Sequence, residues 1–269
     1  MTEFEKPGTK EFETTLPNDL RLAQKVFRSY RETLLSNTGT VAASKKQDGS
    51  DVTALDVEIE DTLRQSLISQ FPGITVLGEE TGYGAISSED CVLIDPIDGT
   101  SSFIEGTPTF TNMYAHIRDR RVVSSLIYNP SLDNEFIAIK GGGAFKNSSP
   151  LNLTQVGLPQ IILCKKEFIE PLKQLLGDGF EYQVPPSGGG HGLTLVAEGA
   201  VAARFQLHAS GIAHDYAPGG LLVEEAGGVN IPILQDRYTF DCNSFVACHP
   251  LLAGRISDNI EAIRQLERS

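Results

Sequence analysis

The chain lacks both a long apolar run and a surplus of basic residues. No stretch approaches the roughly 20 apolar residues that a membrane-spanning helix requires. Lysine and arginine number 22 against 35 acidic residues, so the formal net charge is −13. Nucleic-acid backbones and anionic membranes attract Lys/Arg-rich surfaces, so neither is expected as a partner.

Tryptophan is absent, and cysteine is scarce. The four cysteines are Cys91, Cys164, Cys242 and Cys248. They lie too far apart for a CxxC motif, and this number in a chain of this length is typical of free thiols in a reducing compartment. The polar residues 1–16 are predicted to form a loosely held arm, without the basic start and apolar run of a signal peptide. The sequence therefore predicts a cytoplasmic protein.

Apolar residues make up 40% of the chain, enough for a globular core. Their periodicity predicts helices over residues 18–34 and 53–71. The second helix is expected to bury Val57, Leu63, Leu67 and Ile68 and to expose Glu58, Glu60 and Asp61. The polar segment 36–51 is predicted to be an exposed, mobile loop in which Lys45 and Lys46 are solvated, and a lid role for it stays open.

Short β-rich runs follow and divide the chain into two halves. The runs of the first half span residues 74–77, 91–94, 112–118, 122–128 and 135–140, with turns that suggest antiparallel hairpins. From residue 161 strands and helices alternate in a βα pattern, which ends in a helix over residues 250–266. The sequence thus predicts an α+β domain over residues 1–150 and an α/β domain over residues 151–269.

The segment Asp95-Pro96-Ile97-Asp98-Gly99-Thr100 carries the most informative chemical pattern. A strand with a buried character delivers two carboxylates, and Pro96 restricts the backbone between them so that both converge on one point. The helix expected after Gly99 offers free backbone N–H groups that suit a phosphate oxygen. Asp-Pro and Asp-Gly are also common turn formers, so this segment alone does not separate a site from a turn.

Two further acidic elements favour a site. Glu79 and Glu80 follow the strand at 74–77, and Asp215 opens a helix whose first turn should contain Pro218. Two carboxylates about 4 Å apart repel each other by about 4 kcal/mol at an effective dielectric near 20. Such a site protonates or holds divalent cations, and oxygen ligands without Cys or His favour Mg²⁺ over Zn²⁺. Because Mg²⁺ binds substrate phosphates, the pattern predicts phosphate chemistry.

These segments resemble the signatures of the inositol monophosphatase family of Mg²⁺-dependent, lithium-sensitive phosphatases. Residues 95–100 are similar to its first signature and residues 214–228 to its second. Supporting matches, in family order, are residues 50–56, 78–80 and 142–145. The resemblance implies a layered αβαβα sandwich of the inositol monophosphatase and fructose-bisphosphatase type, a homodimer, and two to three Mg²⁺ ions per site.

The resemblance also implies individual roles around the metal. The metal ligands would be Glu79, Asp95, Asp98, Asp215 and the carbonyl of Ile97. Glu79 and Thr100 would hold the attacking water, and Asp56 would orient the Thr100 hydroxyl. Glu79 is preferred to Glu80 on the family's spacing alone. The implied reaction is direct attack of a metal-activated water on a phosphate monoester.

Departures from the family pattern concern the substrate side of the site. His214 stands where the family usually has tryptophan, and residues 187–192 replace the Gly-Thr-Ala motif of inositol-selective members. The acidic residue expected against an inositol ring falls at Gln206 or His208, and neither is acidic, which weakens the case for myo-inositol 1-phosphate. The expected substrate-binding residues are Asp98, Gly99, Thr100, Ser187, Gly188, Gly189, Gln206, His208 and Asp215.

The leading hypothesis is a Mg²⁺-dependent phosphomonoesterase that acts on a small phosphorylated metabolite, such as a polyol or sugar phosphate. A histidinol-phosphatase or a 3′(2′),5′-bisphosphate nucleotidase of the same family is the alternative. A metal-gated metabolite sensor on a degenerate phosphatase scaffold is the non-enzymatic alternative, although a sensor has no need of Thr100 to activate water.

Overall fold

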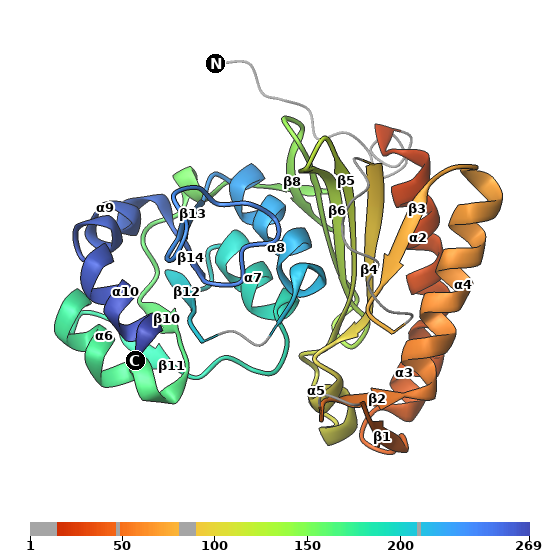
Figure 1. Cartoon of the computed structure of the whole chain (residues 1–269), viewed down its shortest axis with the longest axis horizontal. Helices are drawn as coiled ribbons and strands as arrows, with labels where there is room; N and C mark the ends of the chain where they lie inside the picture. Colours follow the sequence, from red (N-terminus) through yellow and green to blue (C-terminus); the bar gives the residue numbers. More distant parts are fainter. Residues whose placement is uncertain (1–14, 47–48, 81–89, 209–210) are drawn as a thin grey trace.

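Helices and sheets alternate in five layers in the computed structural model, which describes residues 15–46, 49–80, 90–208 and 211–269 (Figure 1). The first layer consists of α2 (Asn18–Ser29), α3 (Arg31–Asn37) and α4 (Ala54–Gln70). The second is a seven-stranded sheet in sequence order: β3 (Thr75–Gly78), β4 (Asp90–Asp98), β5 (Thr111–Arg118), β6 (Arg121–Asn129), β7 (Asn134–Ile139), β8 (Gly143–Lys146) and β9 (Ser149–Leu151). β3 and β4 run parallel, and each later pair is antiparallel.

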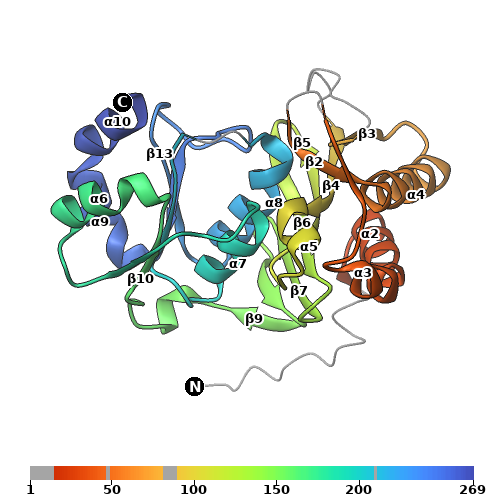
Figure 2. The same ribbon diagram turned by 90° about the horizontal axis from the view of Figure 1, so that it is seen from below.

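The remaining three layers come from the second half of the chain. The middle layer, between the two sheets in Figure 2, holds α7 (Gly190–Ala197) and α8 (Ala213–Glu225). The second sheet has the order β11–β10–β12–β14–β13, with β10 (Ile161–Leu163), β11 (Glu181–Gln183), β12 (Ala203–Gln206), β13 (Val229–Pro232) and β14 (Phe245–Cys248). The outer helices are α6 (Ile169–Leu176), α9 (Pro250–Asp258) and α10 (Ile260–Arg268). This is the layered αβαβα arrangement that the family resemblance implies.

One apolar core crosses the middle layer. It includes Leu93 of β4 and Leu221 of α8, and it continues to Phe245 of β14, so both sheets contribute to it. The chain passes from one sheet to the other between β9 and β10. Because the core is shared, α8 is fixed against both sheets, while a division into domains at residue 150 stays a prediction.

The predicted burial of α4 is wrong at three positions. The buried stripe consists of Leu55, Ile59, Leu63 and Leu67, spaced four residues apart. Val57 and Ile68 lie off this stripe and are 43% and 47% exposed. Glu60 lies beside it and is fully buried, because Arg64 and the Glu80 amide satisfy its carboxylate at 3.3 and 2.8 Å.

Four local expectations also change. The helical segment predicted to start at residue 18 divides at Tyr30, and the one predicted at the C-terminal end divides at Asn259. The predicted loop 36–51 contains β1 (Ala43–Lys45), which pairs with β2 (Asp51–Thr53) in an antiparallel hairpin; residues 47–48 lie outside the described residues. Pro218 lies in the second turn of α8, so the His214 carbonyl lacks its helical N–H donor.

Other expectations concern the chain ends and the cysteines. All four cysteines are free, as predicted, and the structure shows that all four are buried. Of the predicted arm, residues 1–14 lie outside the described part of the chain. Within the described part, every helix is too short or too polar to cross a membrane.

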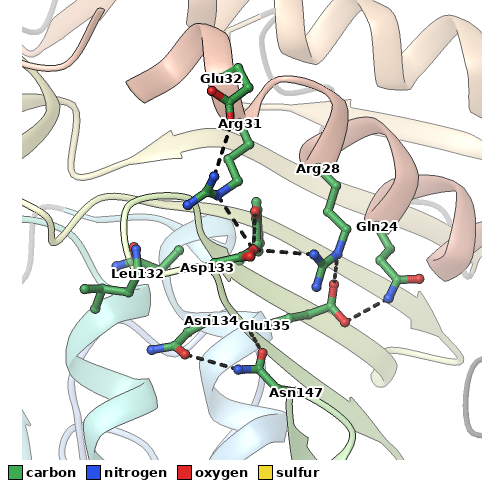
Figure 3. A network of polar contacts seen from close by, with 11 residues as sticks. Gln24, Arg28, Arg31, Glu32, Leu132, Asp133, Asn134, Glu135 and Asn147 are labelled. Atoms are coloured by element: carbon green, nitrogen blue, oxygen red, sulfur yellow. Dashed lines mark hydrogen bonds and ion pairs between the residues drawn. The ribbon is translucent and has the colours of Figure 1, made fainter. Parts of the chain in front are cut away.

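A polar network attaches the first helical layer to the seven-stranded sheet (Figure 3). The buried Glu135 carboxylate of β7 accepts hydrogen bonds from Gln24 at 2.8 Å and from Arg28 at 3.0 Å. Arg28 also stacks on the ring of Tyr128, with its guanidinium carbon 5.2 Å from the ring centre. These contacts fix α2 across the sheet, on the face that also supports α4.

Candidate active site

A β-bulge at the end of β4 brings Asp95 and Asp98 together. Along β5 their partners Met113 and Thr111 are two residues apart, whereas Asp95 and Asp98 are three apart, so β4 has one extra residue here. In a regular strand, residues three apart point to opposite faces, and the bulge cancels this alternation. The side chain of Asn112 donates to the Pro96 carbonyl at 2.5 Å and fixes the bulge.

A glycine-rich turn holds the Asp98 carboxylate. Its two oxygens accept the backbone N–H groups of Gly189 at 2.7 Å and Gly190 at 2.8 Å. The hydroxyl of Thr111 donates a third hydrogen bond at 3.0 Å. A Cβ atom at Gly188 would lie 2.6 Å from an Asp98 oxygen, so this close approach requires glycine. Burial nevertheless raises the pKa of Asp98 to about 6, despite the opposing effect of these amides.

Asp215 completes the acidic group from the first turn of α8. Its carboxylate accepts the Ile212 amide at 2.5 Å, which fixes the side chain at the helix start. Oxygen atoms of Asp95, Asp98 and Asp215 lie within 4.8 Å of one another. Burial, and next the charge of Asp98, raises the pKa of Asp215 to about 7.

Asp95 provides a direct test of whether this group suits a cation. Both of its carboxylate oxygens are buried, and among the described residues no N–H or hydroxyl group donates a hydrogen bond to either of them, while the Glu79 carboxyl group lies beside them. Burial raises the pKa of Asp95 well above its usual value, and the charges of Glu79, Asp98 and Asp215 raise it further. A buried carboxylate without donors is costly unless it binds a proton or a cation. The donor set consists of oxygen alone, which fits a hard divalent cation.

Glu79 lies outside this three-residue group. Its carboxylate accepts the Lys46 ammonium at 2.7 Å, and Glu80 accepts the same ammonium at 2.6 Å. The sequence interpretation of Lys46 as a solvated charge is therefore wrong, because the β1–β2 hairpin carries it to the end of β3. Burial, and next the charge of Glu79, raises the pKa of Glu80 to about 7, although Lys46 opposes this shift.

Thr100 and Asp56 meet where α5 (Thr100–Glu105) and α4 begin. The Thr100 hydroxyl lies 3.0 Å from the Ile97 carbonyl and 3.4 Å from an Asp56 oxygen. Asp56 also accepts the amide and hydroxyl of Thr53 at 2.8 and 2.6 Å, so its orientation is fixed. Gly99, just before α5, has a φ of 80°. This left-handed conformation favours glycine.

The residues expected on the substrate side separate into two places. Ser187 lies over Gly99, where a Cβ would be 2.9 Å from the Ser187 carbonyl oxygen. Gln206 is buried and donates to the Tyr216 hydroxyl at 3.0 Å, beside Asp215. His208 instead contacts the outer layer: its ring lies edge-on to Phe168.

His214 occupies the place of the family's tryptophan as a neutral side chain. Its Nε2 donates a hydrogen bond to the carbonyl of Leu77, in β3, at 3.0 Å. Burial lowers its pKa to about 4. The imidazole therefore joins α8 to the strand that precedes Glu79.

Sequence reasoning missed one prominent residue, Arg204 of β12. It is 5% exposed, and it donates to the Gly188 carbonyl at 2.8 Å, to Gly189 at 3.2 Å and to Gln206 at 3.1 Å. Burial lowers its pKa, while the charges of Asp98 and Asp215 oppose that shift. An arginine between the apolar residues Ala203 and Phe205 was the available signal.

The model of the inositol monophosphatase family matches residues 14–265. The inositol monophosphatase of Dictyostelium discoideum is 26% identical over 262 residues, which cover 90% of this chain and 95% of that protein. The histidinol-phosphatase of Chlorobaculum parvum is 30% identical over 221 residues, 78% of this chain and 84% of that protein. The match to inositol monophosphatase 2 of Saccharomyces cerevisiae is more local, with 31% identity over 149 residues, about half of each chain.

The fold agrees with these relationships. The structure of Thermotoga maritima IMPase superposes with a TM-score of 0.80 at 20% identity, over 93% of this chain and 100% of that one. A structural similarity at 20% sequence identity establishes the fold. The match of the family model to nearly the whole chain establishes membership of the family. The chain is a phosphoric monoester hydrolase and belongs to the inositol monophosphatase family.

Proposed function

We propose that this enzyme is a Mg²⁺-dependent phosphomonoesterase acting on a small phosphorylated polyol or sugar. The observation that carries the proposal is the convergence of Asp95, Asp98 and Asp215, whose oxygen atoms lie within 4.8 Å of one another. The buried, donor-free carboxylate of Asp95 supports a cation as their common partner. Two to three Mg²⁺ ions would be held by Glu79, Asp95, the Ile97 carbonyl, Asp98 and Asp215.

In this proposal Mg²⁺ supplies Lewis-acid polarisation of the phosphate and lowers the pKa of water. The protein's own part is to hold the groups in place. The contact between the Thr100 hydroxyl and Asp56 supports a role for this pair in orienting the attacking water. Glu79 would accept a hydrogen bond from the same water, and its Oε2, which Lys46 does not contact, is available for this.

Phosphate binding is assigned to the start of α5. The first N–H groups of a helix have no intrahelical acceptor, and Gly99 allows a close approach. Gly99 and Thr100 would donate these N–H groups to the phosphate oxygens. Ser187 and Gly188 lie directly above Gly99, which supports their place beside the ester.

The leaving group would meet Gln206 where an acidic residue is expected against an inositol ring. Gln206 carries no charge, and its amide lies between Arg204 and Tyr216. No carboxylate is thus available at this position to bind the vicinal hydroxyls of an inositol ring, which favours other polyol or sugar esters. His208 contacts the outer helices, so Gln206 is the better candidate of the two.

A histidinol-phosphatase is the second candidate, favoured by the 30% identity with the Chlorobaculum parvum enzyme. A 3′(2′),5′-bisphosphate nucleotidase is the other alternative, because its ester would use the same metal and phosphate groups. The presence of Thr100 beside Asp56 disfavours a sensor without activity. We further propose a cytoplasmic homodimer, as the family resemblance implies.

The proposal is tested by measuring kcat/KM for inositol, sugar, histidinol and nucleotide phosphates with Mg²⁺ and with EDTA. We expect phosphate release that EDTA abolishes, with a polyol or sugar ester ranked first. A first rank for histidinol phosphate or a nucleoside bisphosphate would replace the proposed substrate by the corresponding alternative. No EDTA-sensitive release from any ester would refute the proposed activity.

A further inference from the structure

A cavity of about 360 Å³ lies between the β5–β6 turn, the end of β7 and one face of α8. Ala217, Leu221 and Glu224 of α8 line it, and their spacing of four and three residues places them on one helix face. Asp215 precedes Ala217 by two residues, about 200° around the helix. The cavity is therefore on the opposite side of α8 from the acidic site, and it shares no residue with that site.

The charge of this cavity is opposite to that of the whole chain. Its basic lining residues are Arg120, Arg121, Lys140 and Arg237, against one acidic residue, Glu224. The chain as a whole carries −13. A positive cluster on an acidic protein creates a local field that attracts anions away from the rest of the surface.

Two of these four basic side chains are already paired. Arg120 lies 3.5 Å from Asp241, and Lys140 lies 3.2 Å from Glu224. Arg121 and Arg237 have no ion-pair partner within the described part of the chain, and both side chains are exposed at the cavity. Two unpaired guanidinium groups are thus available to an external anion. Planar guanidinium groups bind phosphate oxygens in pairs.

The floor of the cavity is apolar and fixed. Leu221 and Phe240 are 3% and 4% exposed. Tyr238 lies edge-on to Phe245, with ring centres 5.1 Å apart. Its hydroxyl lies against α8, where a Cβ at Gly220 would be 2.0 Å away, so the ring cannot shift toward the helix. The cavity therefore offers an aromatic surface next to cationic groups.

We propose that this cavity binds a phosphorylated organic anion of nucleotide size, separately from the substrate. Its phosphates would bind Arg121 and Arg237, and its base or other flat apolar part would contact Tyr238 and Phe240. The volume lies within the range of small-molecule sites, about 300–1,000 Å³. The bound anion would contact the β5–β6 turn from the first half of the chain and α8 from the second.

The test uses the fluorescent nucleotide trinitrophenyl-ADP as probe, with the full chain in EDTA. Without a metal ion the acidic site repels anions, so binding under these conditions reports on the cavity. We expect saturable binding that weakens as salt is raised. The double variant Arg121→Ala/Arg237→Ala should bind at least about tenfold more weakly, because it loses two charge-assisted contacts. Both side chains are exposed and unpaired, so we expect the variant to fold normally and retain activity.

Two controls separate this site from the substrate site and from a protein interface. Arg118→Ala removes an exposed arginine outside the cavity and should bind the probe normally, as should Asp95→Asn. Pyrophosphate, which lacks an apolar part, should displace the probe less well than ADP. Unchanged binding in the double variant would overturn the proposal. So would loss of binding in Asp95→Asn, or a change of oligomeric state in the double variant, which would identify the cavity as a subunit contact.

Discussion

The carboxyl group of Glu60 lies directly against Gly78, so closely that a Cβ atom at Gly78 would be 1.9 Å from the carboxyl carbon. Glu60 is fully buried, and it accepts the Glu80 amide at 2.8 Å. The contact joins α4 to the end of β3, one residue before Glu79. A residue that the sequence suggests is solvated thus fixes the backbone that carries a proposed metal ligand.

Replacing Gly78 by alanine should therefore disturb both stability and activity. The new methyl group has no room unless Glu60 moves and releases the Glu80 amide. Overpacking of this kind costs about 1–3 kcal/mol of unfolding free energy. Urea denaturation and phosphatase assays measure the two effects. Gly157→Ala is the matched control, since nothing lies within 4 Å of its Cβ position and its φ is not positive. Equal free energies of unfolding for the two variants would show that α4 can shift at this contact without loss of stability.

Asp95→Asn should reduce kcat by more than about 100-fold while leaving the fold intact. Asp95 has no hydrogen-bond donor among the described residues, so the substitution removes a proposed metal ligand without removing a donated hydrogen bond. In EDTA the variant should melt at a higher temperature than the wild type, because a buried carboxyl group, whose ionised form burial and the charges of Glu79, Asp98 and Asp215 disfavour, has gone. The rise in Tm on addition of Mg²⁺ should shrink at the same time.

Thermal melts with and without Mg²⁺ measure both effects on the Asp95→Asn protein. Asp61→Asn, on the exposed face of α4, is the control and should keep the wild-type response. A wild-type Mg²⁺ shift in Asp95→Asn would contradict the assignment of Asp95 as a ligand.

Arg204→Lys should weaken Mg²⁺ activation although residue 204 touches none of the proposed ligands by a hydrogen bond. The Arg204 guanidinium holds the carbonyls of Gly188 and Gly189, whose turn presents two amides to Asp98. A lysine cannot reproduce this fork of donors. We expect the apparent dissociation constant for Mg²⁺ to rise, and we expect kcat/KM to fall by about 10–100-fold. Arg118→Lys serves as the control. If the variant has a lower free energy of unfolding but an unchanged apparent dissociation constant for Mg²⁺, the role of Arg204 is purely structural.

The parts of the site that are local in sequence were predictable. The convergence of Asp95 and Asp98 was expected because Pro96 restricts the backbone between them, although the β-bulge that produces it is visible only in the structure. The end of α4 before Pro72 is local in the same way. Family membership and the layered fold follow from several such segments in a fixed order.

The remaining features depend on partners far away in the chain. The burial of Glu60 requires residues 78–80, and the contact of Lys46 with Glu79 requires the β1–β2 hairpin to reach β3. Arg204 acts through a turn that precedes it by fifteen residues or more. The choice between Gln206 and His208 depended on the exact alignment of this segment with the family pattern, which no periodicity reveals. Tertiary placement, rather than local propensity, decides these positions.

Protonation of His116 should make the stability of the fold depend on pH. This histidine contacts the end of β4 that lies opposite the acidic site. Its Nδ1 lies 2.7 Å from Asp19, and its Nε2 lies 2.7 Å from Asp90. Burial opposes protonation, but the hydrogen bonds and charges of the two carboxylates raise the pKa of His116 overall. Burial also disfavours ionisation of Asp19, yet hydrogen bonds from His116 and Tyr114 lower its pKa to about 2. Arg118, the other charged group nearby, lies 3.4 Å from Asp90.

The raised pKa of His116 and the lowered pKa of Asp19 determine how the stability of the fold changes with pH. A raised histidine pKa stabilises the fold below the unfolded value of about 6.5, and the benefit is lost as pH rises through the folded value. A lowered aspartate pKa stabilises above about 3.9, and that benefit is lost as pH falls toward the folded value. His116→Gln should therefore destabilise most between about pH 4 and 6.5. Because Asp90 is exposed to solvent, we expect a difference of only about 1 kcal/mol between pH 5.5 and 8.5. Urea denaturation at the two pH values measures it, with His208→Gln as the control; an equal cost of His116→Gln at both would show that the imidazole stays neutral between its two carboxylates.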